Sequence, residues 1–206
     1  MRDGPEALDG LVRVSRETRD RLERFRLLLE RWQRKTNLVG RDTLATFWTH
    51  HVGDAAFLHG HAREVETWTD MGAGAGLPGL PLAMLAGGEG RPLRVDLVES
   101  NAKKCAFQRA AVLETGLRDG PADVRIHAER LEDHRPVPNT VLTARALAPL
   151  VDLVGHAQRF GARRALFFKG ERHEDEIATA RSRHRFDCDV IPHPLRHGSV
   201  LLDVRL

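Results

Sequence analysis

The sequence predicts an α/β fold: a doubly wound, mostly parallel sheet of seven strands with an N-terminal helical extension. From about residue 65 onward, short apolar segments alternate with helical segments, which is the pattern of such a sheet. A glycine-rich loop at residues 72–79 follows the first apolar segment. Residues 1–62 carry helical periodicity instead. We therefore divide the 206 residues into a helical region, 1–62, and an α/β domain, 63–206.

The composition favours a soluble, cytoplasmic protein with an anionic partner and no membrane association. The formal charge is +3, and arginine supplies most of the positive charge because lysine occurs only at Lys35, Lys103, Lys104 and Lys169. Arginine suits phosphate and guanine, although a GC-rich genome would produce the same bias. The two cysteines have no metal-site spacing. The sequence shows neither an apolar segment near 18 residues nor a signal-peptide pattern.

An amphipathic helix is predicted in the N-terminal region. Leu22, Phe25, Leu29 and Trp32 recur at spacings of three and four, and they form one apolar stripe. Between residues 13 and 35, nine Arg and Lys residues stand against four Asp and Glu residues. This basic excess indicates either a solvated helix face or an RNA-facing surface.

The remaining elements are predicted by their apolar patterns and breaks. In the N-terminal region, residues 36–40 end the first helix, and Asp42 or Thr43 caps the next one. Later helices are expected at 77–85, at 102–114, within 144–160 and at 174–184. Strands are expected at 65–71, 93–98, 124–127, 140–142, 165–168, 186–191 and 199–205, the last two antiparallel to each other.

The glycine loop after the first strand is the candidate ligand site. Glycines at alternate positions from Gly72 permit positive φ and let a ligand approach the backbone closely. Pro78 suits the first turn of the following helix, whose free N–H groups would face the ligand. Residues 74–79 match the dinucleotide fingerprint G-x-G-x-x-G, and Glu99, twenty residues beyond them, is placed to bind a ribose hydroxyl.

These features suit both NAD and S-adenosylmethionine. Asp70 ends the first strand just before the loop, and its negative charge favours a sulfonium and would repel a pyrophosphate. The chain is also too short for a dehydrogenase's separate substrate domain, and it contains no tyrosine, which the commonest short-chain oxidoreductases need. S-adenosylmethionine is therefore the preferred ligand. An NAD-dependent oxidoreductase and a non-catalytic RNA-binding assembly factor are the alternatives.

The histidines do not predict a metal site. His50, His51, His59 and His61 lack a cysteine or carboxylate that would complete a recognisable ligand set, so we expect no metal. His51 and Asp54 are three residues apart, so they share a helix face and could hydrogen-bond each other. The seven other histidines are scattered along the chain, and we expect them at the surface.

Six short motifs, in one order, carry a family resemblance. They are Asn37-Leu38, His51-Val52-Gly53-Asp54, residues 70–81, Ala128-Glu129-Arg130-Leu131-Glu132, Ala144-Arg145-Ala146 and Lys169-Gly170. Together they resemble the bacterial RsmG (GidB) family, from about residue 22 to the last strand. The resemblance implies a Rossmann-like methyltransferase sheet, a monomer, and methyl transfer from S-adenosylmethionine to N7 of a guanine in 16S ribosomal RNA.

The resemblance also implies roles for individual residues. Besides Asp70, the donor pocket would be formed by Gly72, Gly74, Leu77, Glu99, Leu131, Glu132 and Arg145. The RNA side would be lined or supported by Asn37, His51, Asp54, Arg145 and Lys169. The chain departs from the family's usual pattern at Gly53 and Ala55, and its last strand lacks the usual basic ending.

The implied reaction needs no general base. Guanine N7 carries a lone pair and no proton, so the enzyme must mainly align two groups, which can be worth ~7–11 kcal/mol. The catalytic candidates are Arg145, on guanine O6/N7 or a flanking phosphate, and Lys169, on a phosphate or base. From the residues alone, structural roles stay open: Arg145 could pair with Glu132, Lys169 could mark a strand's exit, and His51 and Asp54 could be a structural pair.

Overall fold

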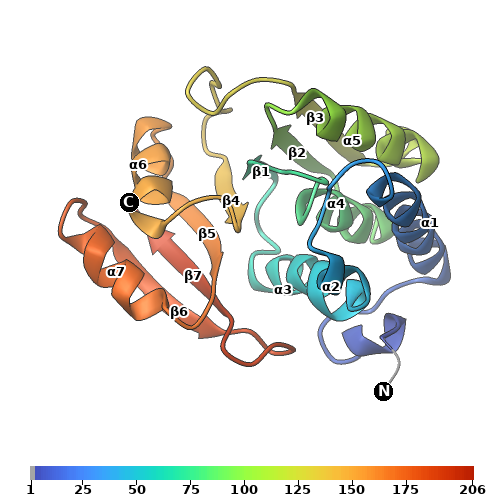
Figure 1. Cartoon of the computed structure of the whole chain (residues 1–206), viewed down its shortest axis with the longest axis horizontal. Helices are drawn as coiled ribbons and strands as arrows, with labels where there is room; N and C mark the ends of the chain where they lie inside the picture. Colours follow the sequence, from blue (N-terminus) through green and yellow to red (C-terminus); the bar gives the residue numbers. More distant parts are fainter. Residues whose placement is uncertain (1–2) are drawn as a thin grey trace.

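The protein forms a seven-stranded sheet with helices on both of its faces (Figure 1). The computed structural model describes residues 3–206, apart from the side chain of Arg41. The strand order is β3-β2-β1-β4-β5-β7-β6, and β7 is antiparallel to both neighbours while all other pairs are parallel. The strands are β1 (Thr67–Met71), β2 (Leu93–Val98), β3 (Ala122–His127), β4 (Val141–Arg145), β5 (Arg164–Lys169), β6 (Asp187–Pro192) and β7 (Val200–Arg205). The predicted sheet is confirmed.

The helices alternate with the parallel strands, as predicted. Before the sheet the structure describes η1 (Pro5–Leu8), α1 (Arg16–Gln33), α2 (Arg41–Leu44), the π-helical segment η2 (Phe47–Val52) and α3 (Gly53–His61). Within the α/β part it describes α4 (Gly79–Gly88), α5 (Ala102–Glu114), η3 (Leu117–Asp119), α6 (Leu150–Arg159) and α7 (His173–Arg181). Ser15 caps α1, because its side chain accepts a hydrogen bond from the backbone N–H of Thr18.

Two helix starts differ from the predictions. The expected caps Asp42 and Thr43 are wrong, since α2 begins at Arg41 after Gly40, and the Thr43 hydroxyl donates back to the Gly40 carbonyl at 2.8 Å. Pro78 lies just before α4 instead of in its first turn, so Gly79 is the first helical residue. The N-cap of α2 thus lies earlier than predicted, at Gly40, whereas α4 begins one residue later than the position predicted for Pro78.

One boundary matters for function. The predicted fourth strand ended at Leu142, whereas β4 continues to Arg145, where it pairs with Phe168 of β5. The extra residues keep the β-ladder with β5 and place Arg145 at the carboxyl end of a central strand. Ala146, which follows, has a positive φ of 51° and turns the chain away from the sheet.

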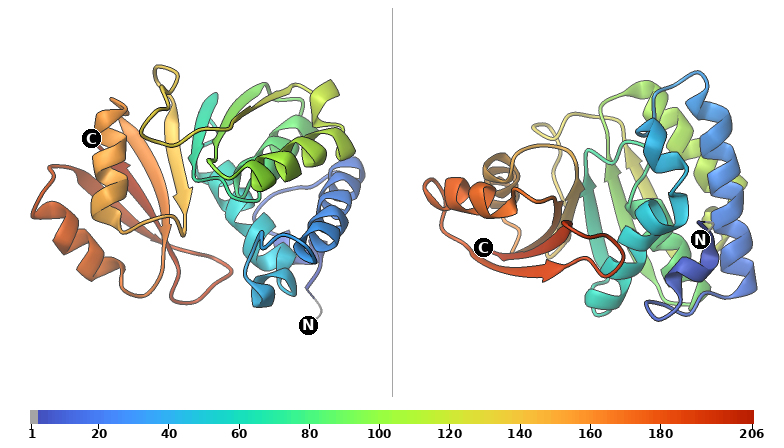
Figure 2. Two further views of the ribbon diagram at one scale, coloured as in Figure 1. Left: turned by 45° about the horizontal axis from the view of Figure 1, so that its top comes forward. Right: turned by 60° about the horizontal axis from the view of Figure 1, so that its bottom comes forward.

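The two faces of the sheet carry separate hydrophobic clusters. Successive residues of β5 alternate between them, because Leu166 belongs to one cluster and Phe167 to the other. The first cluster includes buried side chains of α1, α3, α4 and α5, and the second includes those of α6 and α7. Figure 2 shows these two groups of helices on opposite sides of the strands. This arrangement is the doubly wound layering that the sequence predicted.

The N-terminal helices share the first cluster with the sheet. Leu22, Phe25 and Leu29 are buried, so the predicted apolar stripe of α1 faces the core. Phe25 lies between Phe47 of η2 and Phe107 of α5, with ring centroids 6.0 and 5.9 Å away. The division at residue 62 stays a prediction, but the helical extension contributes to the core of the whole molecule. Among residues 3–206, no helix has the length and apolar character needed to cross a membrane.

Two histidines that we expected at the surface are buried. His134 is 4% exposed and His193 is 5% exposed. His134 lies 2.7 Å from Glu129, and the ring of His193 packs at 5.2 Å on that of Phe57. Tertiary partners thus cover these imidazoles, which isolated positions in the sequence could not indicate.

Candidate active site

A cavity of about 580 Å³ opens at the carboxyl ends of β1, β4 and β5. In open α/β sheets this edge is where ligands bind. Three of the cavity's walls come from these strand ends: the glycine loop after β1, Arg145 and Ala146 at the end of β4, and the segment from Phe168 to Gly170 at the end of β5. The rest of the lining comes from η2, the segment Leu38–Gly40, Thr43, the loop before β7, and Lys104 of α5 and Glu176 of α7.

The glycine loop has the conformation that its sequence predicted. Gly72, Gly74 and Gly76 all have positive φ, between 56° and 72°, a region that residues with side chains rarely adopt. The N–H of Gly74 donates to Oε2 of Glu99 at 2.9 Å. The carbonyl of Gly74 accepts from the side chain of Gln108, also at 2.9 Å. The loop is therefore held from β2 and α5, and its backbone faces the cavity.

Glu99 supports the loop from behind. Its other carboxylate oxygen, Oε1, accepts the N–H of Asn101 at 2.8 Å, and the residue is 8% exposed. It does not line the cavity, so its ribose contact stays a prediction. Leu77 does line the cavity, together with Gly72 and Gly74.

Asp70 is directed at the start of α4 and not into the cavity. Its Oδ2 accepts the N–H of Gly79 at 3.1 Å, and the residue is 1% exposed. Burial raises the pKa of Asp70 to about 7. A carboxyl with this pKa is only partly ionised near neutral pH, which weakens the charge argument for a sulfonium that the sequence suggested. The site role of Asp70 accordingly stays a prediction.

Arg145 is the centre of a polar cluster at the cavity wall. Its Nη1 lies 2.6 Å from Nδ1 of His51 and 3.2 Å from Oδ2 of Asp54. Asp54 is fully buried, and its second oxygen accepts from Nη2 of Arg196. His51 and Asp54 do lie together as the sequence predicted, but they meet through Arg145. The alternative pairing of Arg145 with Glu132 is not formed, because Glu132 lies in another part of the structure, beside Arg159.

His51, and His50 beside Arg196, are neutral near pH 7. Burial, and then the charge of Arg145, lower the pKa of His51 to about 2. Burial, and then the charge of Arg196, lower the pKa of His50 to about 4. With Nδ1 of His51 unprotonated, it can accept the hydrogen bond from Arg145, so the imidazole orients the guanidinium without competing for its charge.

Lys169 ends β5 and lines the cavity, but its ammonium group has partners in the protein. Nζ donates to the carbonyl of Ala148 at 2.8 Å and to Oε2 of Glu176 at 2.6 Å. The same Glu176 oxygen accepts the N–H of Leu150 at 2.8 Å. Lys169 thus joins the end of β5 to the starts of α6 and α7, and its contact with a substrate stays a prediction.

Asp54 lies behind Arg145 and outside the cavity lining, and three other predicted site residues also lie outside the lining. Asn37 is exposed, and its side chain accepts from Gln33 at 3.4 Å. Leu131 packs against the second hydrophobic cluster, and Glu132 is exposed. The backbone carbonyls of both accept hydrogen bonds from Arg159.

Sequence reasoning missed several lining residues. Arg196 comes from the β6–β7 loop, which extends to the N-terminal helices (Figures 1 and 2). His50 was considered only as a metal ligand, and Lys104 only in the composition. Gln33, which does not line the cavity itself, was missed as well. Its side-chain oxygen accepts hydrogen bonds from the N–H groups of Leu38 and Val39, and its side-chain NH₂ donates to the carbonyl of Val39, so Gln33 fixes the cavity rim. No local signal marks Arg196 or His50, because Arg196 contacts Asp54 and His50, which lie far away in the sequence.

Comparisons with known proteins identify the family. The family model described as "GidB: rRNA small subunit methyltransferase G" matches residues 18–192. The chain belongs to this family. The ribosomal RNA small subunit methyltransferase G of Ruegeria sp. (strain TM1040) is 39% identical over 207 residues, covering 100% of this chain and 98% of that protein. Its counterpart in Methylobacterium sp. (strain 4-46) is 44% identical over 186 residues, covering 87% and 84%.

Solved structures confirm the Rossmann-like methyltransferase fold. A methyltransferase from Geobacter sulfurreducens aligns with a TM-score of 0.57 at 18% identity, covering 97% of this chain and 93% of that one. The glycopeptide N-methyltransferase MtfA, complexed with sinefungin, aligns with a TM-score of 0.59 at 12% identity, covering 76% and 86%. At such identities the likeness concerns the fold alone.

In this member of the GidB family, the cavity lining has a net positive charge. Lys104, Arg145, Lys169 and Arg196 line it, and Glu176 is the one carboxylate among the described lining residues. A cavity with this excess of positive charge attracts anionic ligands and focuses their approach.

Proposed function

We propose that this protein transfers a methyl group from S-adenosylmethionine to N7 of a guanine in 16S ribosomal RNA, as a cytoplasmic monomer. One observation carries the proposal: the glycine loop and the held guanidinium of Arg145 face the same basic cavity in a chain of the GidB family. The glycine loop suits the methyl donor, and the guanidinium of Arg145 suits the nucleic acid.

The glycine loop fits the methyl donor. A Cβ on Gly74 would have only the carbonyl oxygen of Gly72 nearby, at 3.8 Å, so the backbone there borders open space that a ligand can use. Gly72, Gly74 and Leu77 would hold the donor, with Glu99 fixing the loop from behind. S-adenosylmethionine supplies a methyl group activated on a sulfonium. Leu131 and Glu132 are retained as donor-pocket residues on the resemblance alone, and Asp70 is retained for its position near the end of β1, just before the glycine loop.

The basic wall fits an RNA acceptor. A guanidinium fork matches guanine O6 and N7 or a phosphate, and His51 and Asp54 hold that of Arg145 in place. Lys104 and Arg196 add positive charge toward the phosphate backbone. Guanine N7 needs no proton removed, so these residues act by orientation and charge rather than as a base. Asn37 and Lys169 are retained as RNA-side residues on the same resemblance.

The test combines donor binding with mapping of the product. Calorimetry should detect S-adenosylmethionine or S-adenosylhomocysteine binding to the full chain, and Gly74→Val should abolish it. Incubation with labelled donor and either small ribosomal subunits or naked 16S rRNA should place the label on N7 of one guanine. Deleting the gene should remove N7-methylguanine at that same position in cellular rRNA.

Each alternative predicts a different result. Binding of NADH without binding of either adenosyl ligand would contradict the proposal and favour an oxidoreductase. Binding to small subunits without transfer of label to any of the RNA substrates would favour a non-catalytic assembly factor. Label on an atom other than guanine N7 would retain the methyltransferase and reject the acceptor.

A further inference from the structure

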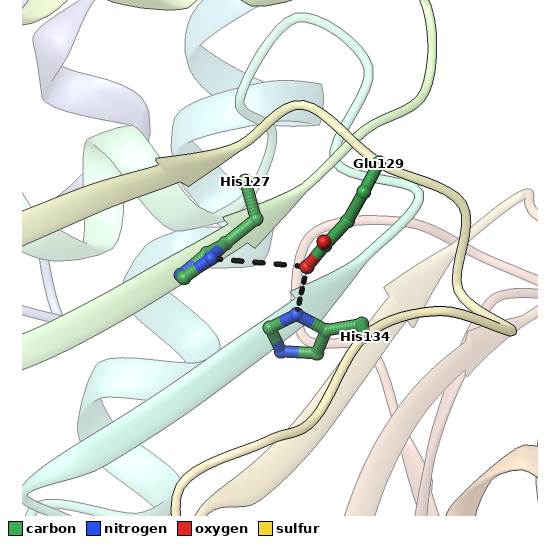
Figure 3. A group of neighbouring side chains, drawn as sticks. All are labelled: His127, Glu129 and His134. Carbon is green, nitrogen blue, oxygen red and sulfur yellow. Dashed lines mark hydrogen bonds and ion pairs between the residues drawn. The ribbon is translucent and has the colours of Figure 1, made fainter.

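A second polar cluster lies outside the cavity, after the end of β3. It consists of His127, the last residue of β3, with Glu129 and His134 from the segment that leads to β4 (Figure 3). One nitrogen or oxygen of each side chain lies within 4.8 Å of the other two. Nδ1 of His134 is 2.7 Å from Oε1 of Glu129, and Nδ1 of His127 is 4.0 Å from the same oxygen.

The imidazole of His127 is oriented from its far side. Its Nε2 lies 2.6 Å from Oδ1 of the buried Asp96, so Nε2–H donates to that carboxylate. Asp96 is itself held by Arg94 through two hydrogen bonds, at 2.8 and 3.0 Å. Nδ1 of His127 then carries the lone pair and points toward Glu129. A carboxylate that fixes the tautomer and rotation of a histidine in this way is the usual support of a metal-ligating imidazole.

His134 is suited to the same role. Its side chain is 3% exposed and therefore fixed, and its ring centroid is 4.7 Å from that of His127. Nδ1 now donates its proton to Glu129, while Nε2 is buried without a partner. Coordination through Nδ1 releases that proton or shifts it to Nε2, and it breaks no hydrogen bond at Nε2.

The distances between the side chains are close to the edges of a coordination tetrahedron without matching them. Zinc ligands at ~2.0–2.2 Å from the ion lie roughly 3.3–3.6 Å from one another. The distance from Oε1 of Glu129 to Nδ1 of His134, 2.7 Å, is below this range, and the distance from the same oxygen to Nδ1 of His127, 4.0 Å, is above it. A small rotation of Glu129 away from His134 and toward His127 brings both distances into the range. Glu129 is 39% exposed, so it can rotate, and water can reach the fourth position.

We propose that His127, Glu129 and His134 bind one divalent transition-metal ion, with Zn²⁺ the best match. Two imidazoles and one carboxylate suit Zn²⁺ and its neighbours, whereas Mg²⁺ and Ca²⁺ prefer oxygen ligands alone. The ion ties the segment after β3 to the end of that strand. We expected no metal from the sequence, because His127 and His134 were grouped with the scattered histidines expected at the surface. The proposal does not depend on methyl transfer.

Metal titration of the full chain tests the site. After removal of metals with a chelator, calorimetry with Zn²⁺ should give one equivalent per chain, and Zn²⁺ should raise the melting temperature because it binds only the folded site. Co²⁺ should give a visible spectrum typical of nitrogen and oxygen ligands. Hydrogen exchange in residues 128–134 should slow when Zn²⁺ is added.

The variants leave the buried His134 unchanged, because its replacement would also destabilise the fold. His127→Ala and Glu129→Gln should each weaken Zn²⁺ binding at least tenfold and remove the rise in melting temperature. His197→Ala, an exposed histidine in the β6–β7 loop, is the matched control and should bind as the unmodified chain does. Equal binding by all four proteins, a thiolate-to-cobalt band from Cys105 or Cys188, or no binding by the unmodified chain would overturn the proposal.

Discussion

At the scale of single residues, a fully buried carboxylate holds the two arginines of the cavity wall. Asp54 accepts from Arg145 and Arg196, and His193 lies 3.1 Å from one of its oxygens. His51 adds a neutral acceptor to Arg145. A guanidinium that two partners already hold in place loses little conformational entropy when it binds a substrate. Binding in one fixed geometry is therefore favoured.

Replacement of Arg145 tests this arrangement. Arg145→Ala should lower methyl transfer to rRNA about 5- to 150-fold, because one bidentate contact to a base is worth ~1–3 kcal/mol. Arg145→Lys should recover little of this loss, since an ammonium lacks the fork. Arg183→Ala, at an exposed position in the turn after α7, is the control. Steady-state rates as a function of RNA concentration measure the effect, and an unchanged kcat/KM for Arg145→Ala would reject the role.

Asp70 predicts a pH dependence of stability. Its pKa is about 7 in the folded chain, against about 3.9 for an ordinary aspartate, so the folded state binds more protons than the unfolded state between those values. The free energy of unfolding should therefore fall as pH rises from 4 to 7, by at most roughly 4 kcal/mol from this group. Asp70→Asn keeps an acceptor for Gly79 and should lose this dependence.

Urea unfolding of both chains at several pH values measures the difference. The variant should gain stability relative to the unmodified chain as pH rises, because only the unmodified chain has a buried acid to ionise. Parallel pH profiles for the two proteins would show that folding does not raise the pKa of Asp70.

At the scale of elements, the glycine loop has a left-handed backbone at three glycines and borders the cavity. Gly72 and Gly76 are also confined by neighbours, since an added Cβ would lie 2.4 Å from Leu147 and from Leu80, respectively. Gly74 is limited by its φ alone. Element positions follow from sequence periodicity, but the contacts that lock this loop, from Glu99 and Gln108, come from other elements.

Gly74→Ala separates backbone strain from ligand binding. It should cost about 1–3 kcal/mol of stability for the left-handed φ and should also weaken donor binding, because the new methyl group enters the cavity wall. Gly90→Ala is the matched control, since Gly90 has φ 70° with no atom near an added Cβ, in the turn before β2. It should show the same strain in urea unfolding and unchanged donor affinity by calorimetry. Equal affinities in both variants would place the donor elsewhere.

At the scale of the whole molecule, the cavity is assembled from both ends of the chain. The N-terminal segment supplies Leu38 and His51, the sheet supplies the glycine loop and Arg145, and the β6–β7 loop supplies Arg196. The N-terminal helices also share a hydrophobic cluster with α4 and α5. We therefore expect the helical region and the sheet to unfold together.

Phe25 tests this cooperativity. Phe25→Ala should destabilise the whole chain by ~3–5 kcal/mol, since the ring is buried between η2 and α5. Leu27→Ala, on the same helix but 45% exposed, should change stability little. Fluorescence and far-UV circular dichroism should follow one transition in each protein. Separate transitions would show that residues 1–62 fold as an independent unit.

Local patterns were sufficient for much of the fold. The alternation of apolar segments located seven strands, and the glycine spacing located the loop, because both patterns depend on residues close together in the chain. Patterns did not locate the end of β4, since its last residues, including Arg145, are held by the ladder with β5. They also missed the burial of His134 and His193, whose neighbours come from other elements.

The sequence by itself determined the fold class, the family resemblance, the presence of a glycine loop, and the choice of Arg145 as a site residue. Only the tertiary structure decided what each side chain faces. It turned Asp70 toward α4, tied Lys169 to Glu176, and brought Arg196 to Asp54 across 142 positions of the chain. Periodicity records which face of an element is apolar, whereas hydrogen bonds between polar groups depend on which elements become neighbours after the sheet has formed.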